Sequence, residues 1–226
     1  MSPIPESWDG YAERWSVLHG GYDPRRASPL VQGWLRVAYR IARTLAGRRV
    51  TPSAVTAAGV VVAAAVPAVV VPGPTGGLAA AALVLLGALA DTADGALAVI
   101  TGSETRLGQI YDSVADRLSE AAWLLGLYLL GAPGWLSAGC LAVTWLHEYV
   151  RARATVAGMS EIGAVTVGER PTRVLLALFG LASAGTAGLV APDAVTATAT
   201  VAAAVWAALS TVGLLQLGLA VRRTLR

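Results

Sequence analysis

The chain is poor in charged residues and in residues that could cross-link it. Only 14% of its 226 residues are charged, whereas soluble domains carry about a quarter. Lysine is absent, so all 17 basic residues are arginine. The single cysteine, Cys140, lies in an apolar segment, which excludes a disulfide framework. The first 28 residues lack the charged-then-apolar layout of a signal peptide, so we expect the first membrane span to direct insertion.

Hydrophobic residues dominate what remains. They make up 55% of the chain, the mean hydropathy is +0.61, and apolar runs near twenty residues recur. Such runs predict an all-α integral membrane protein rather than one globular core. We expect six transmembrane helices preceded by an interfacial amphipathic helix. The expected spans are residues 54–71, 79–100, 107–130, 134–157, 172–190 and 195–221.

Three segments are expected along the chain. Residues 1–28 form a polar and aromatic N-terminal segment, in which Trp8, Tyr11 and Trp15 have roughly helical spacing; both an interfacial segment and a loose tail remain open. Residues 29–50 show an apolar stripe opposite three arginines, which is typical of an amphipathic helix lying in the interface. Those arginines are Arg36, Arg40 and Arg43. Residues 51–226 form the six-helix membrane domain.

The arginines also predict the orientation. The loops between expected helices one and two, three and four, and five and six contain no basic residue. All arginines fall on the other side, and the positive-inside rule places that side in the cytoplasm. We therefore expect a multi-pass protein of the inner (cell) membrane with both termini and the active site cytoplasmic.

Four aspartates interrupt the apolar pattern. Asp91 and Asp94 are spaced i,i+3, and Asp112 and Asp116 i,i+4, so each pair lies on one helix face. A charge inside the membrane costs about 2.5–3.5 kcal/mol or more, and four facing carboxylates need cations. Hard oxygen ligands favour Mg²⁺ or Mn²⁺, two ions per subunit. The alternative is buried polar pairing with Arg117 or around Glu120.

The same stretch resembles the signature of the CDP-alcohol phosphotransferases, D-x2-D-G-x2-A-R-x8-G-x3-D-x3-D. Seven of its eight fixed positions match with the correct spacing. The matching residues are Asp91, Asp94, Gly95, Ala98, Gly108, Asp112 and Asp116. The departure is Val99, where the family has arginine. The six-helix layout, the leading interfacial helix and the Thr-Pro before the first span also resemble this family.

The resemblance implies a reaction and its participants. The aspartates would be metal ligands, and Asp116 would also be the catalytic base on an acceptor hydroxyl. The phosphatidyl group of CDP-diacylglycerol would be transferred and CMP released. The implied donor-binding residues are Asp91, Asp94, Gly95, Ala98, Gly108 and Asp112, with Arg106 as a further phosphate contact. The resemblance implies a homodimer in the lipid bilayer, and we expect no nucleic-acid partner.

The run Arg151-Ala-Arg153-Ala and the later Glu169-Arg170-Pro171 resemble motifs of the phosphatidylinositol-phosphate synthases and their archaeal counterparts. Four arginines would then bind the phosphate of an inositol phosphate acceptor; the alternative is that they are flanking positive charge on the cytoplasmic side. These are Arg151, Arg153, Arg170 and Arg173. Two features depart from those synthases: Leu217 follows Gln216 where they have arginine, and His147 and Glu148 are unusual at their position.

Alternatives therefore remain open. The acceptor could be glycerol 3-phosphate or another alcohol, and His147 with Glu148 is either a satisfied polar pair or part of an altered acceptor pocket. The chain could also be a catalytically impaired family member with a scaffolding role, marked by Val99. A transporter that uses intramembrane aspartates is disfavoured, because the carboxylates cluster at one face with no charged counterpart at the other.

Overall fold

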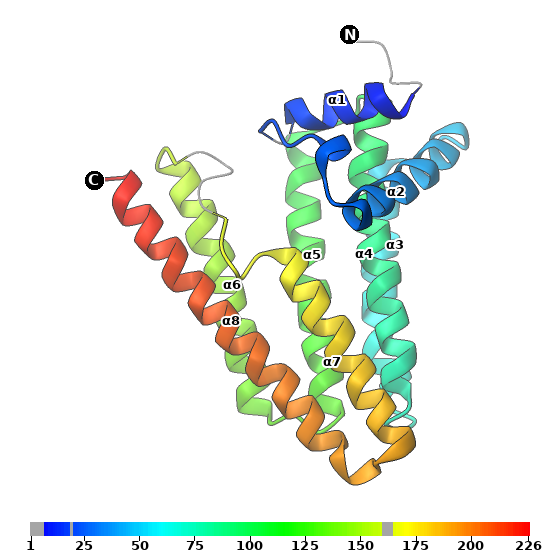
Figure 1. Ribbon diagram of the computed structural model, residues 1–226, viewed down its shortest axis with the longest axis vertical. Coiled ribbons are helices and arrows are strands. Elements are labelled where there is room, and N and C mark those ends of the chain that lie inside the picture. Colours follow the sequence, from blue (N-terminus) through cyan, green and yellow to red (C-terminus); the bar gives the residue numbers. More distant parts are fainter. Residues whose placement is uncertain (1–6, 19, 160–164) are drawn as a thin grey trace. The chain divides into compact units, whose positions relative to one another are not determined.

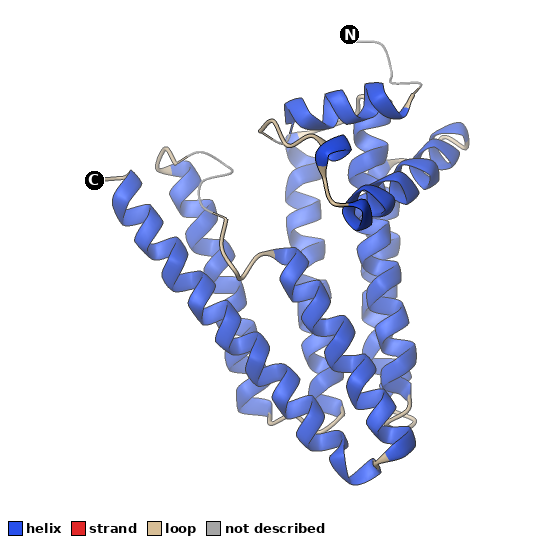
Figure 2. Ribbon diagram, viewed as in Figure 1, coloured by secondary structure: helices blue, strands red, loops and turns tan. Residues whose placement is uncertain are grey.

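The structure is a computed structural model that describes residues 7–18, 20–159 and 165–226. Every regular element in these ranges is a helix (Figures 1 and 2). The α-helices are α1 (Trp8–Leu18), α2 (Pro29–Gly47), α3 (Pro52–Val70), α4 (Gly76–Thr101), α5 (Arg106–Leu129), α6 (Gly134–Val156), α7 (Arg170–Val190) and α8 (Val195–Thr224). Two short 3₁₀ helices complete the described part, η1 (Pro24–Arg26) and η2 (Pro192–Ala194).

Local sequence explains where several helices begin. The Ser28 hydroxyl accepts a hydrogen bond from the Val31 amide, and Pro29 occupies the first position of α2. Pro52 begins α3 in the same way. Pro67 lies inside α3, a position that membrane helices tolerate because neighbouring groups satisfy the freed backbone.

In the part of the chain that the structure describes, four helical segments are long and apolar enough to cross a membrane. They are Pro52–Val70, Gly76–Thr101, Arg170–Val190 and Pro192–Thr224. Helices α5 and α6 have suitable length but carry the charged and polar side chains described below, which lower their mean hydropathy. The fold is therefore all-helical with several membrane spans, as the apolar runs predict.

The chain divides into two compact units. The N-terminal unit contains residues 1–61 and 86–116. Its core is an aromatic and aliphatic cluster to which α1, α2 and α4 contribute, centred on Tyr11, Tyr39, Leu97 and Ile100. Tyr11 is completely buried, and its ring centroid lies 5.0 Å from that of Tyr39. Within the N-terminal segment, Trp8–Leu18 is thus a helix that packs on this cluster.

The C-terminal unit contains residues 62–85 and 117–226. Trp123 and Trp206 are its largest buried side chains, and α8 packs against both α6 and α7. Small residues allow close helix contact, as is common in membrane proteins. A Cβ atom on Gly77 would lie 2.6 Å from the carbonyl oxygen of Leu181, so α4 and α7 approach here only because that position is glycine.

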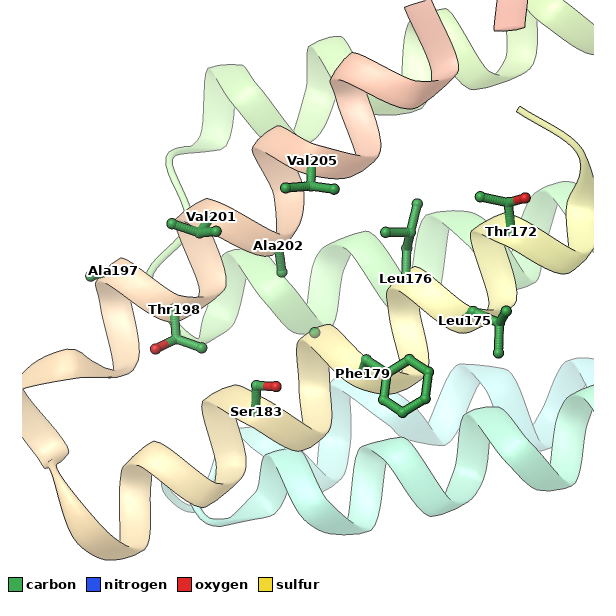
Figure 3. A pocket seen from close by; sticks show the side chains of 11 residues that line it. Thr172, Leu175, Leu176, Phe179, Ser183, Ala197, Thr198, Val201, Ala202 and Val205 are labelled. Carbon is green, nitrogen blue, oxygen red and sulfur yellow. The ribbon is translucent and has the colours of Figure 1, made fainter. Parts of the chain in front are cut away.

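An apolar groove of about 640 Å³ runs between α7 and α8 (Figure 3). Leu175, Phe179, Val201 and Val205 line it with exposed side chains, and Thr198 and Ser183 contribute hydroxyl groups. Both helices belong to the membrane-crossing set. The groove therefore presents an apolar surface of the kind that contacts lipid chains.

Candidate active site

The connection between α4 and α5 places the two pairs of aspartates. Gly102 has a φ of +63°, the left-handed conformation that glycine adopts after a helix end. The Thr105 hydroxyl then accepts a hydrogen bond from the Gly108 amide at 2.9 Å and caps the start of α5. A Cβ atom on Gly108 would lie 3.0 Å from that hydroxyl, so glycine suits the capped turn. The chain reverses within a few residues, and α5 returns beside α4.

This reversal brings three of the four aspartates together. Carboxylate oxygens of Asp91, Asp112 and Asp116 all lie within 4.8 Å of one another. Asp116 is 9% exposed, and the other two are partly buried. Like charges at this separation repel each other, more strongly in a partly desolvated site than in water. The geometry suits a divalent cation, which prefers carboxylate oxygens and offsets their repulsion.

The fourth aspartate has a separate partner. The Asp94 side chain, 6% exposed, accepts a hydrogen bond from the Thr56 hydroxyl of α3 at 2.5 Å. Asp94 is not a member of the three-carboxylate group. Thr56 therefore orients Asp94 in this structure, and the assignment of Asp94 as a metal ligand stays a prediction.

A second hydrogen bond holds the turn between Asp91 and Asp94. The indole nitrogen of Trp34 in α2 donates to the Thr92 hydroxyl at 2.9 Å, and that hydroxyl donates to the Ala88 carbonyl in the preceding turn. Sequence reasoning did not identify Thr56, Thr92 or Trp34 as part of the site. Thr92 occupies a variable position of the signature, and Thr56 and Trp34 lie on helices distant in sequence, so no motif marks them.

The remaining signature positions differ in their surroundings. A Cβ atom on Gly95 would meet nothing within 4 Å, so the space beside it is open. Ala98 is partly buried, and Arg106 is exposed at the first position of α5. Val99 is 3% exposed and belongs to the apolar cluster of the N-terminal unit. The position that departs from the signature thus lies in a hydrophobic core.

The four arginines predicted to bind the acceptor each have a different environment. Arg153 is exposed near the end of α6. Arg151 is partly buried and paired with Glu169. The Arg170 guanidinium lies 5.9 Å from the ring centroid of Trp123, within cation–π range. Arg173 is 1% exposed and lies among acidic side chains.

Arg173 belongs to a buried ionic network of α5, α6 and α7. Its guanidinium nitrogens lie 3.0 Å from a Glu120 oxygen and 2.7 Å from a Glu148 oxygen. Arg117 contacts the same two carboxylates, at 2.8 Å and 3.5 Å. Glu120 is completely buried. Two cations and two anions thus alternate, and each carboxylate has two arginine partners.

The network continues through His147 to the loop before α7. A guanidinium nitrogen of Arg173 lies 3.0 Å from His147 Nδ1, and arginine has only donors, so we assign Nδ1 as the acceptor. His147 Nε2 then carries the proton and donates to the Thr166 hydroxyl at 3.0 Å. Thr166 in turn donates to Glu169 at 2.9 Å. His147 and Glu148 thus each contact Arg173, while a role in an altered acceptor pocket stays a prediction.

The same loop is attached to α8. The Val167 amide donates to the side-chain oxygen of Gln216 at 3.0 Å. Leu217, which follows it, is 1% exposed and packs in the core rather than at the loop. Gln216 therefore binds the backbone of the loop before α7.

Comparisons with known proteins agree with the geometry. A family model described as CDP-alcohol phosphatidyltransferase matches residues 49–214. The archaetidylinositol phosphate synthase of Pyrococcus horikoshii is 32% identical over 138 residues, which cover 61% of this chain and 72% of that protein. The phosphatidylinositol phosphate synthase of Mycobacteroides abscessus is 34% identical over 113 residues, which cover 47% of this chain and 50% of that protein.

Solved structures of a phosphatidylinositol phosphate synthase from Mycobacterium tuberculosis share the fold. The crystal structure with CDP-DAG bound has a TM-score of 0.63 and 26% identity, over 80% of this chain and 94% of that chain. The structure in complex with manganese and citrate has a TM-score of 0.64 and 25% identity, over 82% and 88%. The apolar helices indicate that the chain is embedded in a membrane. Because the family model matches most of its length, the chain belongs to the CDP-alcohol phosphatidyltransferase family.

Proposed function

We propose that the protein makes phospholipid by transferring the phosphatidyl group of CDP-diacylglycerol to a polar alcohol, with release of CMP. The observation that carries this proposal is the convergence of Asp91, Asp112 and Asp116 at the spacing of the family signature. The solved relative that binds CDP-DAG supports the choice of donor.

The carboxylate group fits a divalent metal. Its oxygens are hard ligands from two helices and lie close enough to share an ion. When bound, Mg²⁺ or Mn²⁺ would neutralise the charge of the donor's diphosphate and of the departing phosphate. The manganese complex of the solved relative supports this choice of ion type. We propose that Asp91, Asp94 and Asp112 hold two ions, with Asp116 beside them.

Asp116 is proposed as the general base. Its carboxylate would take the proton of the acceptor hydroxyl as that oxygen attacks the β-phosphorus of the donor. The bond between the β-phosphorus and the bridging oxygen breaks, and that oxygen leaves with CMP. Phosphoryl transfer depends on positioning and charge neutralisation. Gly95, Ala98 and Gly108 would leave room for the donor, and exposed Arg106 would contact its phosphates.

The proposed acceptor is a polyol phosphate such as inositol phosphate. The named activities of the relatives support it, and so does the arginine set near the loop before α7. Arg151, Arg153 and Arg170 are the candidates, because guanidinium groups bind phosphate through paired donors. Arg173 already contacts Glu120 and Glu148 in the core, so we now propose that it anchors the helices instead of binding the acceptor.

The membrane arrangement is part of the proposal. Helices α3 to α8 would be six transmembrane helices, with α2 in the interface and the active site and both termini in the cytoplasm. The arginine distribution supports this orientation. The exposed basic face of α2, which includes Arg36, Arg40 and Arg43, suits anionic lipid headgroups. A homodimer is proposed from family resemblance.

A second acceptor class is favoured by one observation. Position 217, where the phosphatidylinositol-phosphate synthases usually have arginine, is a buried leucine, so this chain lacks that basic side chain. Glycerol 3-phosphate or another alcohol is therefore the alternative acceptor. A catalytically impaired scaffold is the remaining alternative, since Val99 replaces the signature arginine.

A CMP-release assay with purified protein tests these proposals. CDP-diacylglycerol and Mg²⁺ or Mn²⁺ would be supplied with inositol phosphate, free inositol, glycerol 3-phosphate, serine or no acceptor. We expect release with inositol phosphate that stops on chelation with EDTA and returns with added metal. Release with glycerol 3-phosphate alone would select the second acceptor class. Intact CDP-diacylglycerol binding without release for any acceptor would contradict the enzymatic proposal.

A further inference from the structure

Val99 and helix α1 share one hydrophobic cluster. Val99 is 3% exposed, and Tyr11 of α1 is completely buried in the same cluster, together with Leu97 and Ile100 of α4. The signature has arginine at position 99. A guanidinium there would be buried in an apolar cluster, which is unfavourable unless it gains a charged partner. Valine at position 99 is therefore compatible with the packing of α1 on this cluster.

Two faces of α1 differ in character. The docked face buries Tyr11 and Ala12, and the rings of Trp8 and Trp15 lie 5.6 and 5.7 Å from that of Tyr11. The opposite face is open, with Val17 80% exposed. Helix α1 thus has a defined docking surface on the N-terminal unit.

Helix α1 also holds the connection between α4 and α5. A guanidinium nitrogen of Arg14 lies 3.3 Å from both carboxylate oxygens of Glu104. A Cβ atom on Gly102 would lie 3.4 Å from the same guanidinium. The pair is partly exposed, with side-chain exposures of 26% for Arg14 and 29% for Glu104. Glu104 lies in the connection that joins α4, which carries Asp91, to α5, which carries Asp112.

We propose that helix α1 is a positioning element of the carboxylate site, and that valine at position 99 is the residue that allows it to dock. The helix fixes the start of α5 through Arg14 and Glu104, and so fixes the separation of the carboxylates. This inference rests on the proposed metal-dependent function, because the consequence of undocking is weaker metal binding.

One substitution made at two positions tests the docking. Val99→Arg introduces a guanidinium under α1, whereas Val17→Arg makes the same change on its exposed face. We expect Val99→Arg to raise hydrogen exchange of residues 8–18 by at least about tenfold and to lower the melting temperature in detergent. Val17→Arg should change neither. Unchanged exchange in Val99→Arg would contradict the docking role of the valine.

Combining Val99→Arg with a substitution that removes a neighbouring side chain gives a second test. Tyr11→Ala removes the side chain that α1 inserts into the cluster. In the Val99→Arg/Tyr11→Ala double variant, the arginine gains access to water through the space left by tyrosine. The double variant should therefore lose less stability than the sum of the two single variants. Additive losses would show that position 99 and α1 are independent.

Charge reversal tests the link to the metal site. Arg14→Glu and Glu104→Arg, each alone, should weaken Mn²⁺ binding about threefold, within the range for a partly exposed ion pair. The double reversal restores the pair and should restore the affinity. The same variants should raise the metal concentration for half-maximal CMP release and leave the acceptor KM unchanged. Equal Mn²⁺ affinity in all variants would overturn the positioning role.

The two proposals fail in different ways. Wild-type protein that binds Mn²⁺ but releases no CMP would contradict the proposed function, while an Mn²⁺ affinity coupled to Arg14 and Glu104 would still support the inference. Normal CMP release with an Mn²⁺ affinity independent of α1 would support the proposed function and contradict the positioning role of α1. An absence of Mn²⁺ binding in wild-type protein would overturn both.

Discussion

In the N-terminal unit three acidic side chains lie close together, whereas in the C-terminal unit acidic and basic side chains pair in a buried network. Asp91, Asp112 and Asp116 converge within 4.8 Å. By contrast, each carboxylate of the buried network contacts both Arg117 and Arg173. Convergent charges of one sign destabilise a fold, whereas an alternating network with good geometry offsets much of its own desolvation.

This difference indicates that the carboxylate group serves function and that the ionic network stabilises the fold. A group of like charges is retained in spite of its cost when it binds something of opposite charge, and intramembrane carboxylates are functional by default. A balanced network needs no ligand for charge neutralisation, because its cations and anions neutralise one another. Substitutions in the first region should therefore affect activity more than stability, and substitutions in the second should do the reverse.

The largest expected effect is loss of activity without loss of stability. Asp116→Asn should lower CMP release about 10²–10⁴-fold, because the general base is removed. Its melting temperature should stay the same or rise, since one like charge leaves the group. Asp193→Asn, the same change at an exposed position in η2, is the control. Wild-type turnover by Asp116→Asn would show that another group takes the proton.

The second effect is loss of stability from the balanced network. Arg173→Met leaves completely buried Glu120 with one fewer charged partner and should cost about 3–5 kcal/mol. Thermal unfolding in detergent measures this loss, with exposed Arg153→Met as the matched control. The double variant Arg173→Met/Glu120→Leu removes both charges and should recover much of the stability. A double variant no better than Arg173→Met would contradict a charge-balance role.

A smaller effect is expected at Arg151, which we propose as an acceptor-binding residue. Arg151 pairs with Glu169, which also accepts a hydrogen bond from the Thr166 amide at 2.8 Å. Arg151→Gln should raise the acceptor KM about tenfold, as expected for a lost hydrogen bond to a charged group. The donor KM should stay unchanged. Arg222→Gln at the exposed end of α8 is the control, and an equal rise in both KM values would argue for general disruption.

The smallest effect concerns the hydroxyl beside Asp94. Thr56→Val keeps the side-chain shape but removes the donor to Asp94, and should weaken Mn²⁺ binding about threefold, the size of one ordinary hydrogen bond. Thr56→Ser keeps the hydroxyl and should bind Mn²⁺ nearly as well as the wild type. Titration with Mn²⁺ followed by electron paramagnetic resonance gives both affinities. Equal affinities for the valine and serine variants would show that Asp94 is oriented by other contacts.

Much of the fold could be predicted because helical periodicity is local. The expected span 107–130 corresponds to α5 at Arg106–Leu129, and the span 134–157 to α6 at Gly134–Val156. The short connection after α4 also forces α5 to return beside it. Convergence of Asp91 with Asp112 and Asp116 therefore followed from spacing and loop length.

The role of Arg173 could not be predicted in this way. In the sequence it stands three residues after Arg170 and looks equally suited to phosphate binding. Its partners Glu120 and Glu148 are 53 and 25 residues away, on other helices. Only packing of α5, α6 and α7 reveals that this arginine is buried among carboxylates. Thr56 and Trp34 were missed for the same reason.

The sequence by itself determined which side chains carry the proposed chemistry, because their spacing along two adjacent helices specifies a common face. It also marked Val99 as the departure from the signature, without a cause. Only the tertiary structure showed that Val99 shares a core with Tyr11, 88 positions earlier in the chain. Burial and charge pairing arise between segments distant in sequence, and no local pattern records them.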